Sequence, residues 1–126
     1  MPERNGSLRH HDLCFGCGQA NLFGLQLELR AVADGVEGRF FVKQDHQGEP
    51  GVAHAGVLTA ALEEAMSLAG GRRPARLQIE LLAPAAVGSF VVVRAEGAGP
   101  EHRLSAVACD EEGHVLARAE EAARRT

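Results

Sequence analysis

Side chains that can do acid–base or nucleophilic chemistry are concentrated on one stretch, residues 46–69. Thr59, Glu63 and Ser67 follow one another at intervals of four residues, so on a helix they stack along one edge. His54 immediately precedes the first turn of that helix, where backbone N–H groups without intrahelical partners point outward and can hold an oxyanion. The stretch therefore places a carboxylate, two hydroxyls and a candidate oxyanion site on one element.

A second group of reactive side chains lies near the N-terminus. Cys14 and Cys17 form a C-x-x-C pair that follows His10 and His11. These residue types bind zinc, but the second half of the usual zinc pattern is missing, and all four residues lie within eight positions. No β-α-β context follows that would favour a redox C-x-x-C site. We therefore interpret the pair as part of a buried, glycine-rich turn, and we expect no metal.

The element that must position the first group is the only convincing helix in the chain. Apolar residues recur at helical spacing between residues 56 and 69, which predicts a helix buried against a sheet. Ala and Leu, both strong helix formers, dominate it. Gly70 and Gly71 end it, and Pro74 follows. The predicted buried stripe consists of Val57, Leu58, Ala61, Leu62, Ala65, Leu68 and Ala69.

Alternating apolar and polar residues predict strands on both sides of this helix. The expected strands cover residues 25–31, 36–42, 77–81, 90–96, 102–109 and 114–120. The element order is thus β-β-α-β-β-β-β, which predicts an α+β domain with one long central helix and a mostly antiparallel sheet of about six strands. We expect a single domain over residues 14–126 and a flexible N-terminal arm over residues 1–13.

Composition and charge limit the class of protein. Of the 126 residues, 45% are hydrophobic and 24% are charged, as in ordinary globular domains. The net charge of -4 argues against a nucleic-acid partner. The sequence has no apolar run that could span a bilayer and no apolar signal segment near its polar N-terminus. Because the cysteine count is odd, at three, a disulfide framework is disfavoured, and we expect a cytoplasmic protein without a membrane partner.

The segment GEPGVAHAGVLTAALEEAM, residues 48–66, resembles a motif of hotdog-fold acyl-CoA thioesterases of the phenylacetate-pathway and 4-hydroxybenzoyl-CoA types. In those families an acidic residue lies nine positions after the motif histidine, and nine residues after His54 is Glu63. Some members carry a hydroxyl residue one turn later, which matches Ser67. The family usually has Gly after the histidine. Here Ala55 retains the backbone N–H that contacts the thioester oxygen in family members, but it restricts the backbone.

The resemblance covers nearly the whole chain. The pattern C-x-x-C-G-x-x-N-x-x-G-L at residues 14–25 is similar to a lead-in found in a subset of these proteins. RLQIELLAPAAVG, residues 76–88, resembles their third strand and the Pro-containing turn after it, and DEEGHVLARAE, residues 110–120, resembles their last hairpin. The resemblance implies the hotdog fold and hydrolysis of an acyl-CoA thioester without a cofactor. It also implies a homodimer or homotetramer with the site at the subunit interface.

The resemblance assigns expected roles to particular residues. Glu63 is expected to be the general base or the nucleophile, and the N–H of Ala55 or Gly56 the oxyanion donor. His54 would steady the loop or polarise the carbonyl, Ser67 would orient water, and Gln47 would contact the substrate. The cluster Arg72, Arg73 and Arg76 could hold the phosphates of coenzyme A. We expect Glu64, about 100° round the helix from Glu63, to be structural or solvated.

Three alternative functions make different demands on the sequence. A hotdog dehydratase would need an acid fourteen residues after its loop histidine, and fourteen residues after His46 is Ala60. A non-catalytic dimer that binds acyl-CoA or a small ligand remains the main alternative. A zinc- or partner-binding module would be built on the N-terminal segment. The acyl group and the choice between coenzyme A and an acyl carrier protein stay open.

Overall fold

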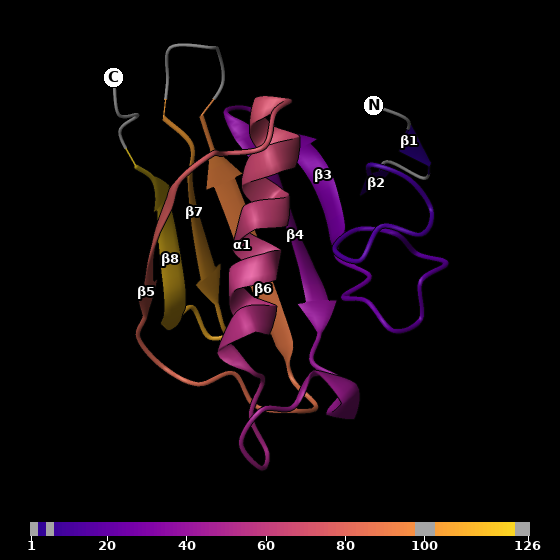
Figure 1. The fold of residues 1–126 in the computed structure, drawn as a ribbon, viewed down its shortest axis with the longest axis vertical. Coiled ribbons are helices and arrows are strands. Elements are labelled where there is room, and N and C mark those ends of the chain that lie inside the picture. The colour runs from indigo at the N-terminus through magenta and orange to yellow at the C-terminus, as the bar shows by residue number, and fades with distance from the viewer. Residues whose placement is uncertain (1–2, 5–6, 98–102, 123–126) are drawn as a thin grey trace.

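The computed structural model describes residues 3–4, 7–97 and 103–122. A single long helix, α1 (Ala55–Gly70), lies across one face of an antiparallel sheet (Figure 1). The helix is capped by His54 and stops at Gly71, whose left-handed backbone (φ 68°) is a conformation that glycine adopts without strain. The predicted helix is therefore confirmed, with one more residue at each end.

The sheet contains six strands of five to seven residues, as the sequence pattern predicts. They are β3 (Glu28–Val32), β4 (Gly35–Phe41), β5 (Leu77–Leu81), β6 (Phe90–Glu96), β7 (Ser105–Cys109) and β8 (Val115–Glu121). Two short strands, β1 (Glu3–Arg4) and β2 (Ser7–Leu8), extend one edge. The strand order is β1-β2-β3-β4-β6-β7-β8-β5, and every pairing among the described residues is antiparallel. β5 follows the helix in sequence but forms the far edge beside β8 (Figure 1).

The core lies between the helix and the inner face of the sheet. Most of the predicted helical stripe is buried, and Val57 and Ala69 at its ends are half-buried. Strand residues at alternate positions, such as Val91 and Val93 of β6, point into the same core because successive side chains face opposite sides of a sheet. Among the described residues, no helix has both the length and the apolar run that crossing a membrane requires.

Part of the expected flexible arm, residues 1–13, makes contacts with the rest of the described structure. Leu8 of β2 pairs with Leu29 of β3, and Arg9 is buried. The following loop, residues 9–27, lies beyond β3 in Figure 1 and is held by backbone hydrogen bonds. The N–H of Leu25 donates to the Phe15 carbonyl at 2.8 Å, for example. Residues 1–2 and 5–6 of the expected arm lie outside the described residues.

Candidate functional site

Within the part of the chain that the structure describes, the start of α1 presents one backbone N–H without a protein partner. The Gly56 N–H donates to Nδ1 of the His54 ring at 2.8 Å, and the Val57 N–H donates to the His54 carbonyl at 2.9 Å. No described residue accepts a hydrogen bond from the Ala55 N–H, and Ala55 is exposed. Of the two donors expected from the sequence, Ala55 is therefore the one whose N–H stays available to a ligand, while His54 caps the helix.

An open cavity of about 400 Å³ lies beside this helix start. Its walls are loop residues 48–49 and 52–54, Ala55 and Leu58 of the helix, Leu81 at the end of β5 and residues 82–84 after it. Val52, Leu58, Leu82 and Pro84 make much of this lining apolar. A cavity with apolar walls beside a free N–H can hold a chain that carries a carbonyl group at one end.

The loop before the helix is fixed by two polar side chains. Gln47 is exposed, and its side-chain oxygen accepts the Gly51 N–H at 2.6 Å, which closes the turn. His46 is buried. Its Nδ1 accepts the Lys43 N–H at 3.0 Å, and its Nε2 lies 3.2 Å from the Gly24 carbonyl. Burial lowers the pKa of His46, so the ring is neutral and donates through Nε2. Both residues thus shape the loop, and neither Gln47 nor His46 lines the cavity.

Glu63 lies further along the helix, half-buried and bound to a cation. Nη1 of Arg73 is 2.8 Å from both carboxylate oxygens of Glu63, and this contact raises the pKa of Arg73. Arg72 makes a bidentate pair with Glu121 at 2.5 and 2.7 Å. Two of the three arginines expected to hold phosphates are therefore engaged with carboxylates of their own chain. Arg76 is exposed.

The expected oxyanion donor, the Ala55 N–H, and the expected catalytic carboxylate, Glu63, lie far apart within one chain. Glu63 lies eight positions after Ala55, which corresponds to about 12 Å along a helix axis. Glu63 is also absent from the lining of the cavity beside Ala55. A single carbonyl group therefore cannot touch the Ala55 N–H and the Glu63 carboxylate of the same chain at once.

A polar cluster that the sequence did not predict surrounds Glu64. Glu64 is only 3% exposed, which excludes the solvated role and leaves the structural one. Its Oε2 lies 2.5 Å from Nδ1 of His10 and accepts from the Cys14 thiol at 3.2 Å. Ser67, expected on an open edge, is 2% exposed, and its hydroxyl lies 3.1 Å from Nε2 of His10. Cys17 completes the cluster.

The cluster shifts the pKa values of its acidic members. Burial raises the pKa of Glu64, but hydrogen bonds from Cys17 and Cys14 and the charge of His10 together bring it below its ordinary value. Burial, together with the neighbouring Glu64, strongly raises the pKa of the Cys17 thiol. The sequence did contain one signal. Glu64 lies three residues after Ala61 and four before Leu68, at the border of the buried stripe.

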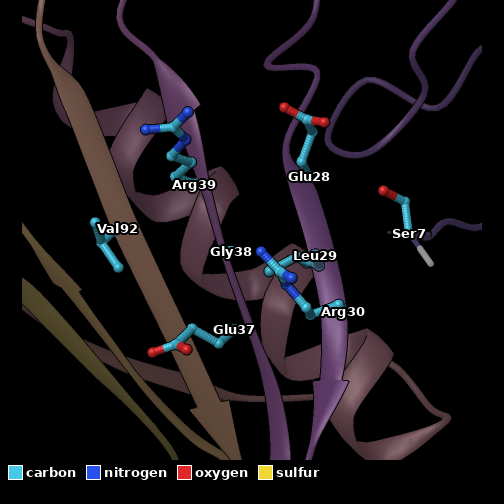
Figure 2. Close-up of a pocket in the computed structure, with 8 residues that line it drawn as sticks. All are labelled: Ser7, Glu28, Leu29, Arg30, Glu37, Gly38, Arg39 and Val92. Carbon is cyan, nitrogen blue, oxygen red and sulfur yellow. The ribbon is translucent and has the colours of Figure 1, made fainter. Parts of the chain in front are cut away.

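A second hollow, of about 410 Å³, lies on the other face of the sheet (Figure 2). Glu28, Arg30, Glu37 and Arg39 of β3 and β4 line it, and the helix lies behind the strands in this view. Arg94 pairs with Glu37, and the Arg39 guanidinium lies 4.1 Å from the centroid of the Phe90 ring. The hollow therefore carries both signs of charge and is separated by the sheet from the helix residues described above.

Comparison with known proteins shows which solved structures share this fold. No protein-family model and no curated protein sequence matches the chain. Solved structures do match. Zebrafish thioesterase superfamily member 2 has a TM-score of 0.66 at 15% identity, over 75% of this chain and 77% of that one. A hypothetical thioesterase from Streptococcus pneumoniae TIGR4, solved with coenzyme A, has a TM-score of 0.65 at 16% identity. The match covers 79% of this chain and 88% of that one. The E. coli PaaI protein from the phenylacetic acid degradation operon has a TM-score of 0.63 at 13% identity, over 75% of this chain and 79% of that one.

These similarities confirm the hotdog fold expected from the sequence. One helix packed against an antiparallel sheet is the shared architecture. At these low identities the match establishes the fold and leaves the chemistry to be argued from this chain's own residues.

Proposed function

We propose that this protein hydrolyses an acyl-CoA thioester to the free acid and coenzyme A. The observation that carries the proposal is the unpartnered Ala55 N–H at the N-terminus of α1, which borders a cavity with apolar walls. The thioester oxygen would accept from this N–H, aided by the helix dipole, while the acyl chain lies along Val52 and Leu58. A donor aimed at the developing oxyanion contributes about 3–4 kcal/mol to lowering the barrier.

Glu63 is the proposed catalytic carboxylate. It would either remove a proton from water as that water attacks the carbonyl carbon, or attack the carbon itself and form an anhydride that water then cleaves. In both routes the carbon–sulfur bond breaks, and the thiolate of coenzyme A leaves and takes up a proton. Arg73 supports this role because it fixes the Glu63 carboxylate from one side. Ser67 stays a candidate for orienting water, although its oxygen already contacts His10.

The proposed site requires two chains. Since Ala55 and Glu63 of one chain are about 12 Å apart, the carboxylate must come from a second copy. The edge strand β5 supports a homodimer, because within the described residues only its β8 side is paired. An unpaired edge readily pairs with another chain. Leu81 and Leu82, at the end of this strand, are 53% and 47% exposed and line the cavity.

Coenzyme A is the proposed thiol carrier. The Streptococcus pneumoniae thioesterase of the same fold was solved with coenzyme A, which supports this choice. The exposed cluster Arg72, Arg73 and Arg76 remains our candidate for the phosphates. Arg72 would have to exchange Glu121 for the ligand, and Arg73 would have to bind it while its Nη1 still holds Glu63. The cavity of about 400 Å³, lined mainly by small and aliphatic residues, suits an apolar acyl group of small or medium size.

The proposal is tested by measuring release of free coenzyme A from short, medium, long and aryl acyl-CoAs with the wild-type protein. A blank without substrate corrects for the three free cysteines of the chain. Turnover of at least one member is expected. If calorimetry finds acyl-CoA binding but no member of the panel is hydrolysed, the non-catalytic binding protein replaces the hydrolase.

A further inference from the structure

Four potential metal ligands from two distant parts of the chain converge beside α1. Nδ1 of His10, the sulfur atoms of Cys14 and Cys17, and a carboxylate oxygen of Glu64 all lie within 4.8 Å of one another. Three of these side chains come from the N-terminal loop, and Glu64 comes from the helix, 47 residues after Cys17. The fourth ligand, which the C-x-x-C segment lacks in sequence, is therefore supplied by the fold.

The distances within the cluster fit a tetrahedral zinc ion. With Zn–S bonds of about 2.3 Å and Zn–N or Zn–O bonds of about 2.0 Å, the edges of the tetrahedron are about 3.3–3.8 Å long. The Cys14 sulfur lies 3.8 Å from His10 Nδ1 and 3.2 Å from Glu64 Oε2, and the Cys17 sulfur lies 3.6 Å from His10 Nδ1. The hydrogen-bonded edge between His10 and Glu64, at 2.5 Å, must open by less than about 1 Å. The two remaining edges, from the Cys17 sulfur to Cys14 and to Glu64, are within 4.8 Å.

We propose that these four residues, His10, Cys14, Cys17 and Glu64, bind one structural Zn²⁺ ion. Two thiolates, an imidazole and a carboxylate form a donor set that suits zinc, and soft thiolates disfavour Mg²⁺ and Ca²⁺. Binding breaks both S–H bonds, and the two protons are released to solvent. The four protein ligands leave no open coordination position, so the ion does not bind substrate.

Groups around the cluster support metal binding. A histidine that binds zinc normally donates its other ring N–H to a fixed acceptor, and Nε2 of His10 lies 3.1 Å from the Ser67 hydroxyl. The backbone N–H of His10 donates to the Cys17 sulfur at 3.0 Å, a contact that stabilises a thiolate. The other oxygen of Glu64 lies 3.7 Å from Nη1 of Arg73, which offsets part of the negative charge of the ligands.

The ion would fasten the N-terminal loop to the helix. Cys14, Cys17 and Glu64 are buried, so few water molecules compete for these ligands. Arg73 contacts both Glu64 and Glu63, which connects the metal cluster to the proposed catalytic carboxylate. The zinc proposal nevertheless stands apart from the hydrolase proposal, because it rests on a different set of atoms and is measured without any substrate.

The first experiment uses the full-length chain, stripped of metal and kept reduced. Titration with Co²⁺ is expected to give the visible absorption of a tetrahedral ion together with thiolate-to-cobalt bands in the near ultraviolet. One equivalent of Zn²⁺ should abolish both. At about a hundredfold excess over its Kd, zinc should raise the melting temperature by about 10 °C. Absence of thiolate bands, or a melting temperature that zinc leaves unchanged, would overturn the proposal.

Matched variants assign the ligands. Cys17→Ser and Glu64→Gln should weaken Co²⁺ binding at least tenfold. Cys109→Ser removes the remaining cysteine, which lies on β7, and Glu96→Gln makes the same acid-to-amide change at an exposed residue of β6. Both variants should bind Co²⁺ like wild type. The assignment would be contradicted if Cys109→Ser weakened Co²⁺ binding as much as Cys17→Ser does, or if Cys17→Ser bound Co²⁺ like wild type. If Cys17→Ser does not fold by circular dichroism, the wild-type titration still decides whether the site exists.

Discussion

Two adjacent glutamates on α1 have different surroundings, and the difference separates two proposed sites. Glu63 is half-buried against Arg73, whereas Glu64 is enclosed by His10, Cys14 and Cys17. The spacing from His54 identified Glu63 in the sequence. The enclosure of Glu64 depends on contacts across about fifty residues, which local periodicity does not contain. The border position of Glu64 on the buried stripe was its only local signal.

The Ala55 N–H can be deleted without breaking the helix. Ala55 is the first helical residue, where proline is favoured, and His54 has the extended backbone (φ -60°, ψ 142°) that a residue before proline prefers. Ala55→Pro should therefore keep the wild-type melting temperature within a few degrees. Its kcat for acyl-CoA hydrolysis should fall by about 10²–10³ because the oxyanion donor is lost.

Ala55→Gly is the control for this variant, since glycine keeps the N–H and restores the residue usual in the resembling families. It should retain most of the wild-type turnover. Steady-state release of coenzyme A and thermal melting measure both variants. If folded Ala55→Pro turns over like wild type, the oxyanion donor has been wrongly assigned.

At the scale of elements, periodicity predicted most of the fold. The helix and the six longer strands follow from patterns with periods of 3.6 and two residues. Periodicity could not predict the conformation of the N-terminal loop. That conformation is set by contacts with α1 and by glycines packed without room for a side chain. Even the expected first strand begins later than predicted, at Glu28, although Leu25 and Leu27 are buried in the core.

Gly16 tests the packing of this loop on the helix. A Cβ atom built on Gly16 would lie 2.5 Å from Cγ of Glu64, closer than real contacts allow. Gly16→Ala should lower the free energy of unfolding, measured in urea, by about 1–3 kcal/mol. Gly113→Ala provides the comparison, because its added Cβ meets no atom within 4 Å and only its positive φ of 91° is unfavourable. The packing argument fails if Gly16→Ala is no less stable than Gly113→Ala.

His46 makes the stability of the loop before the helix depend on pH. Burial lowers its pKa from the ordinary 6.5, so the unfolded chain binds a proton at a higher pH than the folded chain. The stability contributed by the neutral ring is therefore complete above about pH 6.5 and is lost as the pH falls below that value. Urea unfolding between about pH 5 and pH 7 should show this loss, with a flatter profile in His46→Gln. If the unfolding free energies of wild type and His46→Gln change with pH in parallel, His46 is not the source of the pH dependence.

At the scale of the whole molecule, the account requires two chains in one active site. The family resemblance implied an interface site, and the separation of Ala55 and Glu63 on one rigid helix gives the physical reason for it. Among the residues that the structure describes, β5 pairs only on its β8 side, and this edge together with the exposed Leu81 and Leu82 agrees with a dimer formed there.

Complementation between two inactive variants tests the shared site. A heterodimer of Ala55→Pro with Glu63→Gln contains one site in which both the N–H and the carboxylate are native. Random exchange of subunits in an equal mixture should therefore restore about a quarter of the wild-type turnover. Unfolding the two variants together and refolding them allows the exchange, and each variant refolded alone is the control. A mixture no more active than its components would place the site within a single chain.

The most direct test of the central claim is the rate of coenzyme A release by Glu63→Gln with the best acyl-CoA of the panel. Glutamine keeps the shape of the side chain and removes the carboxylate. Glu112→Gln makes the same change in the exposed turn between β7 and β8. If Glu63 is the catalytic carboxylate, kcat/KM falls at least about a hundredfold in Glu63→Gln and stays at the wild-type value in Glu112→Gln. Wild-type turnover by a folded Glu63→Gln would contradict it.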